Sequence, residues 1–247
     1  MNNDRILAGE LTNKQKALGY IILFPSYLYY IPKLAVFFLL WYNNSIHPID
    51  GNVITVYLNV AIGLFSLILG VAFFKDFLMD NIRAFKKTLL EDTIWSCSIG
   101  IGMVYGLAIL SNIIVMVLLA MFNQQQADSS NQQLVELLLN NAPLLMTFQA
   151  VVLAPIVEEL LYRGLIFRTI YSYNKNMAHI LSAFLFGFSH IYSGLFSGDL
   201  TQIIHIIPYM MMGFAFSYAY EKRGNICAPI IMHMLNNLIA TLLSFLL

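Results

Sequence analysis

The sequence predicts an all-α fold, a polytopic bundle of about seven transmembrane helices, and three observations support this class. The 247 residues are 59% apolar and only 11% charged, whereas soluble domains average about 45–50% apolar and roughly 25% charged residues. Seven apolar stretches approach the ~20 residues that a helix needs to cross a bilayer. Among the connections between these stretches, only alternate ones carry basic residues. We therefore expect a multi-pass protein of a cell membrane, surrounded by lipid.

The expected spans follow from the apolar stretches taken in order. They lie near residues 18–42, 52–74, 94–122, 143–169, 177–196, 201–220 and 226–247. Pro25 and Pro32 predict a kink or break in the first span, because proline removes a helical hydrogen bond. The polar stretch "NQQQADSSNQQ" after the third span is expected to be an exposed loop.

The distribution of Lys and Arg predicts the orientation. These residues occur in the N-terminal segment and after the second, fourth and sixth spans, whereas the loops 43–51, 123–142 and 197–200 have none. Because Lys and Arg accumulate in cytoplasmic loops, we expect a cytoplasmic N-terminus and an extracytoplasmic C-terminus. The formal net charge of zero and the lack of a basic tail give no indication of a nucleic-acid partner. The two cysteines, Cys97 and Cys227, are expected to be buried free thiols.

The chain divides into two parts in this interpretation. Residues 1–142 form three N-terminal spans with a cytoplasmic amphipathic connector at about 75–92, and residues 143–247 form a core of four spans. In the connector, Leu78, Ile82 and Phe85 follow helical spacing while Arg83 points elsewhere. Both a helix in the headgroup layer and a linker helix packed on the protein fit that pattern.

Two adjacent glutamates in the fourth span, in "VVLAPIVEELLYRGLIF", point to a function. Ionisable groups at membrane depth cost about 2.5–3.5 kcal/mol each and usually face a partner or a cavity. Glu159 and Arg163 are four residues apart and can pair on one helix face. Glu158 is turned about 100° away from Glu159, so a structural ion pair leaves it unexplained.

Histidines in later spans are candidate partners of Glu158. His190 and His233 lie within spans, and Asn237 follows His233 by four residues and shares its helix face. A glutamate and a histidine can take a proton from water, and a histidine and an asparagine can stabilise an oxyanion. Each histidine alone would more simply be a hydrogen-bonded core residue. His205 is a further candidate nearer the outer side, whereas His179 and His47 at span edges are expected to be interface residues.

A zinc site is the competing interpretation of the same residues. Glu158, His190 and His233 would make a zinc set with an open position for water, although the motif H-E-x-x-H is absent. We favour chemistry without a cofactor, because Asn237 is a poor zinc ligand and a good amide donor.

Three motifs in order resemble one known family, the CPBP intramembrane proteases, also called the CAAX-protease and bacteriocin-processing or Abi family. They are "EELLYR" with Glu158, Glu159 and Arg163; "FGFSH" with Phe186 and His190; and "HMLNN" with His233 and Asn237. The resemblance covers about residues 145–240. It implies that Glu158 is the general base aided by His190, that His233 and Asn237 hold the oxyanion, and that Glu159, Arg163 and Phe186 support the site.

The resemblance implies a hydrolase, an intramembrane endopeptidase whose substrate is a peptide or the tail of a membrane protein. The family includes eukaryotic endopeptidases that trim prenylated tails, and bacterial members linked to peptide maturation, quorum signalling and bacteriocin immunity. We expect a peptidase of a bacterial plasma membrane that processes a small peptide precursor and is reached from the cytoplasmic side. A non-catalytic scaffold or bacteriocin-immunity protein on the same fold is the alternative. A transporter is disfavoured, because transporters usually have internal repeats.

Overall fold

A computed structural model describes residues 5–45, 50–124 and 128–246, with side chains described outside 43–45, and every regular element in these ranges is a helix. Seven helices are long and apolar enough to span a membrane, which confirms the expected number. They comprise residues Asn13–Tyr42, Gly51–Lys87, Leu89–Met121, Pro143–Tyr171, Lys175–Phe196, Gln202–Arg223 and Cys227–Leu246. The protein is therefore an all-α, multi-pass membrane protein.

Several spans are divided into α-helical and wider π-helical segments, labelled α and η. The N-terminal part contains α1 (Asn13–Leu18), η1 (Gly19–Leu23), η2 (Ser26–Tyr30), α2 (Ile31–Ser45), α3 (Gly51–Lys87), α4 (Leu89–Trp95), η3 (Ser96–Gly100), α5 (Ile101–Met121) and α6 (Ser130–Asn141). The C-terminal part contains α7 (Pro143–Phe148), η4 (Gln149–Leu153), α8 (Ala154–Glu159), η5 (Leu160–Phe167), α9 (Arg168–Tyr171), α10 (Lys175–Phe196), α11 (Gln202–Arg223) and α12 (Cys227–Leu246).

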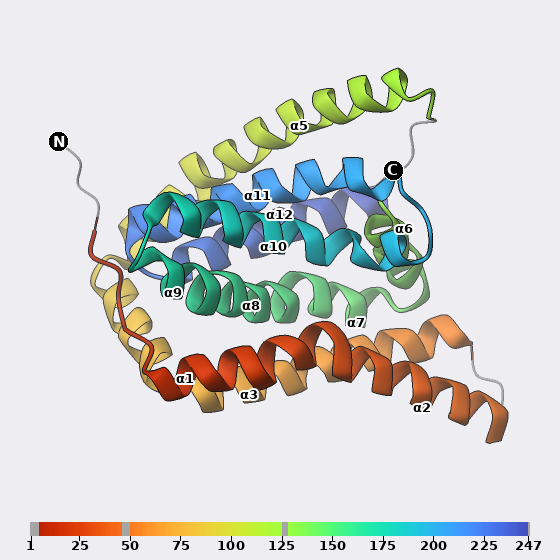
Figure 1. Cartoon of the computed structure of the whole chain (residues 1–247), viewed down its shortest axis with the longest axis horizontal. Coiled ribbons are helices and arrows are strands. Elements are labelled where there is room, and N and C mark those ends of the chain that lie inside the picture. The colour runs from red at the N-terminus through yellow and green to blue at the C-terminus, as the bar shows by residue number, and fades with distance from the viewer. Residues whose placement is uncertain (1–4, 46–49, 125–127, 247) are drawn as a thin grey trace.

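The fourth span lies at the centre of the bundle. In Figure 1 the segment α7–α8–α9 runs between α1, α2 and α3 below it and α10, α11 and α12 above it, with α5 outermost. Half of the most apolar stretch of this span is buried, against 6% for the first span. The first span therefore exposes most of its surface to lipid, while the fourth can hold ionisable groups away from lipid.

Small residues allow neighbouring helices to approach this central span closely. A β-carbon at Gly63 of α3 would lie 2.5 Å from the side-chain oxygen of Gln149. A β-carbon at Gly70 would lie 2.6 Å from Leu160. Glycines at such contacts are typical of packing between transmembrane helices, where close van der Waals contact replaces the hydrophobic effect.

The connector is helical, whereas the polar loop differs from the expectation. The expected connector corresponds to the part of α3 that follows a non-helical break at Phe74 and continues as a helix to Lys87, before α4 begins at Leu89. The loop after the third span is partly helical, because α6 begins within the polar stretch at Ser130. Ser129 caps this helix by accepting a hydrogen bond from the backbone N–H of Gln132.

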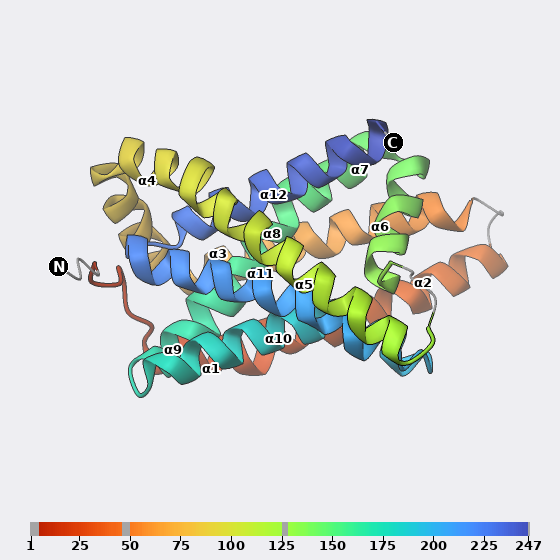
Figure 2. The same cartoon turned by 90° about the horizontal axis from the view of Figure 1, so that it is seen from above.

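The two ends of the bundle differ in charge. Apart from Lys33 and Arg163, the Lys and Arg residues that the structure describes lie at one end, together with α4 and α9, and we call it the basic end. The opposite end carries α6 and the carboxylates Asp50, Asp128, Glu136 and Asp199, and we call it the acidic end. Figures 1 and 2 place the N-terminus near the basic end and the C-terminus near the acidic end, as an odd number of spans requires.

The basic end is closed by hydrogen bonds and ion pairs. The extended N-terminal segment crosses it, with Ala8 donating to the carbonyl of Gly224 at 2.7 Å. Arg223 and Arg5 both donate to Oδ1 of the buried Asp92, at 2.7 Å from Arg223 Nε and 2.9 Å from Arg5 Nη1. These contacts tie the N-terminal segment, α4 and α11 together at this end.

Candidate active site

Glu158 and Glu159 lie next to each other in α8 but have different surroundings. This helix is flanked by the π-helical segments η4 and η5. Such segments are rare in proteins, and those that occur often lie at functional sites. Glu159 is completely buried, whereas Glu158 is 8% exposed and lines a cavity. The turn of about 100° between successive helical residues separates the two carboxylates as expected.

Glu159 forms the pair with Arg163 that its spacing predicts. Nη1 of Arg163 donates to Oε1 of Glu159 at 2.9 Å, and Nη2 donates to the carbonyl of Gly213 at 2.7 Å. The guanidinium also lies 4.8 Å from the centre of the Phe186 ring, within the range of a cation–π contact. Arg163 is itself fully buried, so each charge depends on the other for compensation.

Glu159 has a second partner that the spacing did not predict. Nδ1 of His233 lies 2.9 Å from the same Oε1 atom. A carboxylate paired with arginine accepts hydrogen bonds, so Nδ1 of His233 is the donor. Glu159 therefore also fixes the orientation of His233. The His233 ring stacks on Phe216, with ring centroids 4.7 Å apart.

His190 is held in a similar way by a backbone group. Its Nδ1 lies 2.8 Å from the carbonyl oxygen of Phe186, one helical turn earlier. The ring stacks on Tyr209, with centroids 4.5 Å apart. Because a carbonyl only accepts, Nδ1 carries the proton and Nε2 of the neutral ring has a free lone pair.

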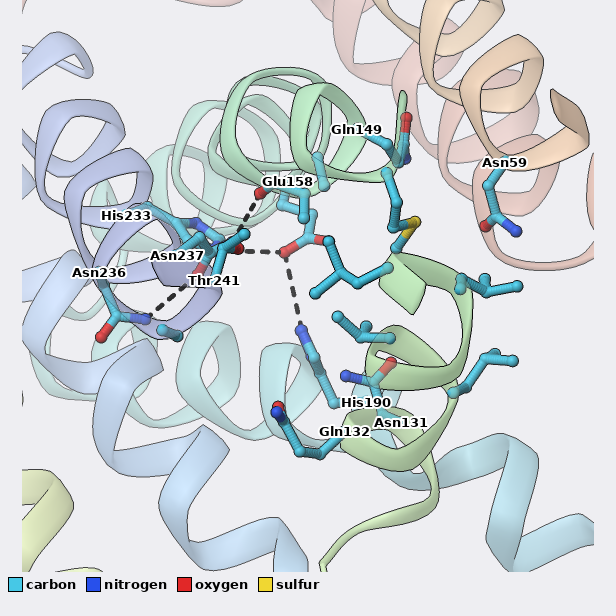
Figure 3. A pocket seen from close by; sticks show the side chains of 18 of the residues that line it. Asn59, Asn131, Gln132, Gln149, Glu158, His190, His233, Asn236, Asn237 and Thr241 are labelled. Carbon is cyan, nitrogen blue, oxygen red and sulfur yellow. Dashed lines mark hydrogen bonds and ion pairs between the residues drawn. The ribbon is translucent and has the colours of Figure 1, made fainter. Parts of the chain in front are cut away.

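Glu158 lies between the two histidines (Figure 3). Its Oε2 atom is 3.8 Å from Nε2 of His190 and 3.8 Å from Nε2 of His233. Its other oxygen, Oε1, accepts a hydrogen bond of 3.0 Å from the hydroxyl of Tyr27. A separation of 3.8 Å is too long for a direct hydrogen bond and suits a bridging water molecule.

Asn237 faces the same cavity, but its side chain also has a backbone partner. Nδ2 donates to the carbonyl of Ala150 at 2.8 Å. In the π-helical segment η4, Ala154 donates to the carbonyl of Gln149, five residues earlier. By the same spacing, residue 155 would donate to the carbonyl of Ala150. That residue is Pro155, which has no N–H. Asn237 thus satisfies a carbonyl that the proline leaves free, and its second amide hydrogen remains for another acceptor.

Two cavities meet at Glu158 and His190. One has a volume of about 270 Å³ and is lined by His233 and Asn237 and by residues near the acidic end, Gln132 and Ser244 among them. The other has a volume of about 420 Å³ and is walled mainly by apolar residues of η2, α2 and α3, namely Leu28, Pro32, Ala35, Val36, Leu39, Leu58 and Ile62.

The first cavity extends away from the basic end. The motif positions suggested entry from the cytoplasmic side, yet the first cavity extends from Glu158 toward the acidic end, while the basic end is closed. Glu158 lies near the middle of its span and His190 lies in the acidic half of α10, so only His233 is displaced toward the basic end. If the basic end is cytoplasmic, as the Lys and Arg residues predict, this cavity faces the other side, so the predicted orientation and the predicted cytoplasmic access do not both hold.

Sequence reasoning missed the residues that come from outside the four C-terminal spans. Tyr27 binds Glu158 from η2, and Asn131 and Gln132 line the first cavity from the stretch expected to be an exposed loop. Ser129 holds the hydroxyl of Tyr209 at 2.6 Å. The signal in the sequence was weak: a tyrosine between Pro25 and Pro32 of the first span, in a stretch with several other tyrosines.

The remaining histidines and the cysteines lie apart from this site. His179 is buried, with its ring nitrogens 2.7 Å from Ser217 and 2.9 Å from Glu221, so it is a core residue and not an interface residue. Ser217 is also fully buried, which leaves this set without access for a substrate. His205 is buried near the acidic end, and His47 lies outside the described residues.

The expectation for the cysteines was wrong in part. Cys97 and Cys227 are both free, but Cys97 is exposed and Cys227 is half-buried.

Glu158 lies further from the two histidines of the alternative zinc set than the ligands of a tetrahedral zinc ion lie from one another. Two ligands about 2.0–2.1 Å from a tetrahedral zinc ion lie about 3.3–3.4 Å apart, whereas Glu158 Oε2 is 3.8 Å from Nε2 of either histidine. Among the residues that the structure describes, no group of three or more His, Cys, Asp or Glu side chains is arranged to hold a metal ion. A zinc ion would require Glu158, His190 and His233 to move closer together.

Comparison with known proteins shows which family the C-terminal part of the chain is similar to. Residues 140–239 match the family of type II CAAX prenyl endopeptidase Rce1-like proteins. This match confirms, for the segment that contains all three motifs, the resemblance to the CPBP or CAAX-protease family.

Individual relatives also match only part of this chain. A "Putative membrane peptidase", YdiL of Bacillus subtilis, is 29% identical over 44% of this chain and 41% of its own. The UPF0177 protein YxdF of Lactococcus lactis is 34% identical over 35% of this chain and 43% of its own. A protein of Mycoplasma capricolum is 34% identical over 38% of this chain and 25% of its own. The matches thus span less than half of each relative. No solved structure matches the chain.

Proposed function

We propose that the protein is an intramembrane endopeptidase in which Glu158 and His190 activate water for attack on a peptide bond. The observation that carries this proposal is the position of Glu158 Oε2, 3.8 Å from Nε2 of both His190 and His233 at the meeting point of two cavities. The peptidase description of the matched family supports the same reaction class.

In the proposed reaction, a water molecule lies between Glu158 and His190. The carboxylate accepts a proton from the water as its oxygen attacks the peptide carbonyl carbon, and the lone pair on His190 Nε2 orients the same water. Glu158 then passes the proton to the amide nitrogen that leaves when the C–N bond breaks. The products are a new carboxyl end and a new amine. General acid–base catalysis of this kind contributes about 10²–10⁴-fold to a rate.

The developing oxyanion would meet donors on α12. Asn237 offers the amide hydrogen that Ala150 does not use, and His233 offers Nε2–H when its ring is protonated. Loss of one oxyanion donor typically lowers kcat by about 10²–10³-fold.

The substrate is proposed to be a small peptide precursor or the tail of a membrane protein. The apolar cavity along η2 and α2 would accept the part of the chain that lies in the membrane, and the cavity toward α6 would accept a polar part. The bacterial relatives support a location in a bacterial plasma membrane.

Peptide profiling tests this proposal. Cells producing the wild type or Glu158→Gln are compared for the peptides present in membranes and medium, with Glu10→Gln as a control because Glu10 is almost fully exposed. The proposal predicts a peptide that is present with the wild type and the control and absent with Glu158→Gln. Identical profiles from equal amounts of folded protein would overturn it and favour a non-catalytic scaffold or immunity protein.

A further inference from the structure

We propose that Tyr27, a residue of the first span, is a positioning residue that fixes the Glu158 carboxylate for the reaction. This inference rests on the proposed function. Tyr27 lies outside residues 140–239, the segment that matches the family. The structure therefore assigns part of the active site to the N-terminal spans.

The contact between Tyr27 and Glu158 is specific to one carboxylate oxygen. The Tyr27 hydroxyl donates to Oε1 at 3.0 Å, while Oε2 faces the two histidines. A carboxylate can rotate about its last bond, and a donor on one oxygen limits that rotation. The tyrosine thus keeps the second oxygen and its lone pairs directed at the place proposed for water.

The segment that carries Tyr27 is anchored on both sides. Leu23 is fully buried, and a β-carbon at Gly19 would lie 2.7 Å from Leu165 of η5. On the other side, the hydroxyl of Tyr192 in α10 donates to the carbonyl of Leu28 at 3.1 Å. Tyr27 is therefore held in place by contacts with the central span and with the helix that carries His190.

The helix geometry of the first span explains how the side chain reaches the site. Tyr27 lies in the π-helical segment η2, which begins directly after Pro25. A π-helical turn contains more residues than an α-helical one and changes the direction in which a side chain points. Tyr29 and Tyr30 of the same segment are 51% and 56% exposed, so Tyr27 differs from its neighbours in facing inward.

The position of Tyr27 also matters for the cavities. It lines both of them, at the point where they meet. Removal of its hydroxyl leaves the ring, and therefore the shape of the cavities, unchanged. The variant Tyr27→Phe thus separates the hydrogen bond to Glu158 from the role of the ring in packing.

The test compares Tyr27→Phe with Tyr30→Phe in the full-length protein, with hydrolysis of the peptide found by profiling and thermal unfolding as measurements. Tyr30 provides the matched control because it has the same side chain, in the same segment, on the exposed surface. Loss of one hydrogen bond to a charged group predicts a fall in kcat of about ten- to a hundredfold. KM and the unfolding temperature are expected to stay unchanged, whereas a purely structural role would lower the unfolding temperature and leave kcat of the folded protein unchanged.

A double-mutant cycle with Glu158→Asp identifies the residue through which Tyr27 acts. The shorter aspartate keeps a carboxylate but withdraws it from Tyr27, so Tyr27→Phe is expected to change kcat by less than threefold in that background. Equal effects of Tyr27→Phe in both backgrounds would overturn the inference, as would equal rates of Tyr27→Phe and Tyr30→Phe. Those results require an active wild type, so they differ from failure of the proposed function, in which the wild type itself would not hydrolyse any peptide.

Discussion

The two sides of α8 illustrate how adjacent, chemically identical residues acquire different roles. On the buried side, Glu159 contacts Arg163 and His233 and has no exposed surface. On the cavity side, Glu158 accepts one hydrogen bond, from Tyr27, and lines both cavities. One oxygen of each glutamate, Oε2, has no hydrogen-bond partner, but only that of Glu158 faces the two histidines. A buried ion pair needs fixed partners that compensate its charges, whereas a general base needs a lone pair that water can reach. The comparison teaches that access to a cavity, and not an unsatisfied oxygen alone, distinguishes the carboxylate that we propose to react from its neighbour.

The largest expected effect is a loss of activity when a residue on the cavity side of α8 is replaced. His190→Ala is predicted to lower kcat by about 10²–10⁴-fold, because the water would lose the group that orients it opposite Glu158. The unfolding temperature should change little, since His190 packs in a partly exposed position beside a cavity. His205→Ala is the control, because His205 is a histidine of the neighbouring helix α11 that lies outside both cavities. Equal rates for the two variants would remove His190 from the reaction.

A change on the buried side should act on stability first. Arg163→Met leaves the carboxylate of Glu159 buried without its cation, which predicts a loss of about 3–5 kcal/mol in the free energy of unfolding. Arg83→Met removes the exposed pair with Asp80 and should change that free energy by less than about 0.5 kcal/mol. Denaturant titration in detergent measures both. A wild-type stability for Arg163→Met would show that this side of α8 is not the structural one.

Asn237 is expected to contribute both to stability and to the reaction. If it donates to the oxyanion as well as to Ala150, Asn237→Ala is predicted to lower kcat by about 10²–10³-fold and stability by about 1–3 kcal/mol. Asn141→Ala removes a similar bond to a helix carbonyl far from the site and serves as the control for stability. A stability loss with unchanged kcat would restrict Asn237 to its backbone contact.

The side of the membrane to which the first cavity opens can be measured by thiol labelling, without an activity assay. In a background of Cys97→Ser and Cys227→Ala, Gln132→Cys should react in intact cells with a thiol reagent that does not cross membranes. Asp80→Cys at the basic end should react only after the membrane is permeabilised. The reverse pattern would show that the cavity opens to the cytoplasm and that the orientation predicted from Lys and Arg is wrong.

The sequence predicted the parts of this molecule that depend on regular spacing. Apolar length gave the seven spans, and four-residue spacing gave the pair of Glu159 with Arg163 and the shared cavity face of His233 and Asn237. These patterns are readable because helix geometry relates residues close in the chain. The roles of the catalytic set stay predictions, since geometry alone does not measure a reaction.

Contacts between distant segments could not be predicted in this way. The bond from Tyr27 to Glu158 joins residues 131 positions apart, and the bond from His233 to Glu159 joins residues 74 apart. No periodicity encodes which of two adjacent carboxylates receives a distant donor. The cavity-lining start of α6 was missed for another reason: its polar composition is typical of loops, and only its contacts with Tyr209 and Gln202 show its place.

The most direct test of the central claim is the hydrolysis rate of purified, folded Glu158→Gln, measured on the peptide that profiling identifies. Glutamine keeps the size of the side chain and can still hydrogen-bond to Tyr27, but it cannot take a proton from water. The account predicts a fall in kcat of about 10²–10⁴-fold with an unchanged unfolding temperature. A rate within threefold of the wild type would contradict the assignment of Glu158 as the base.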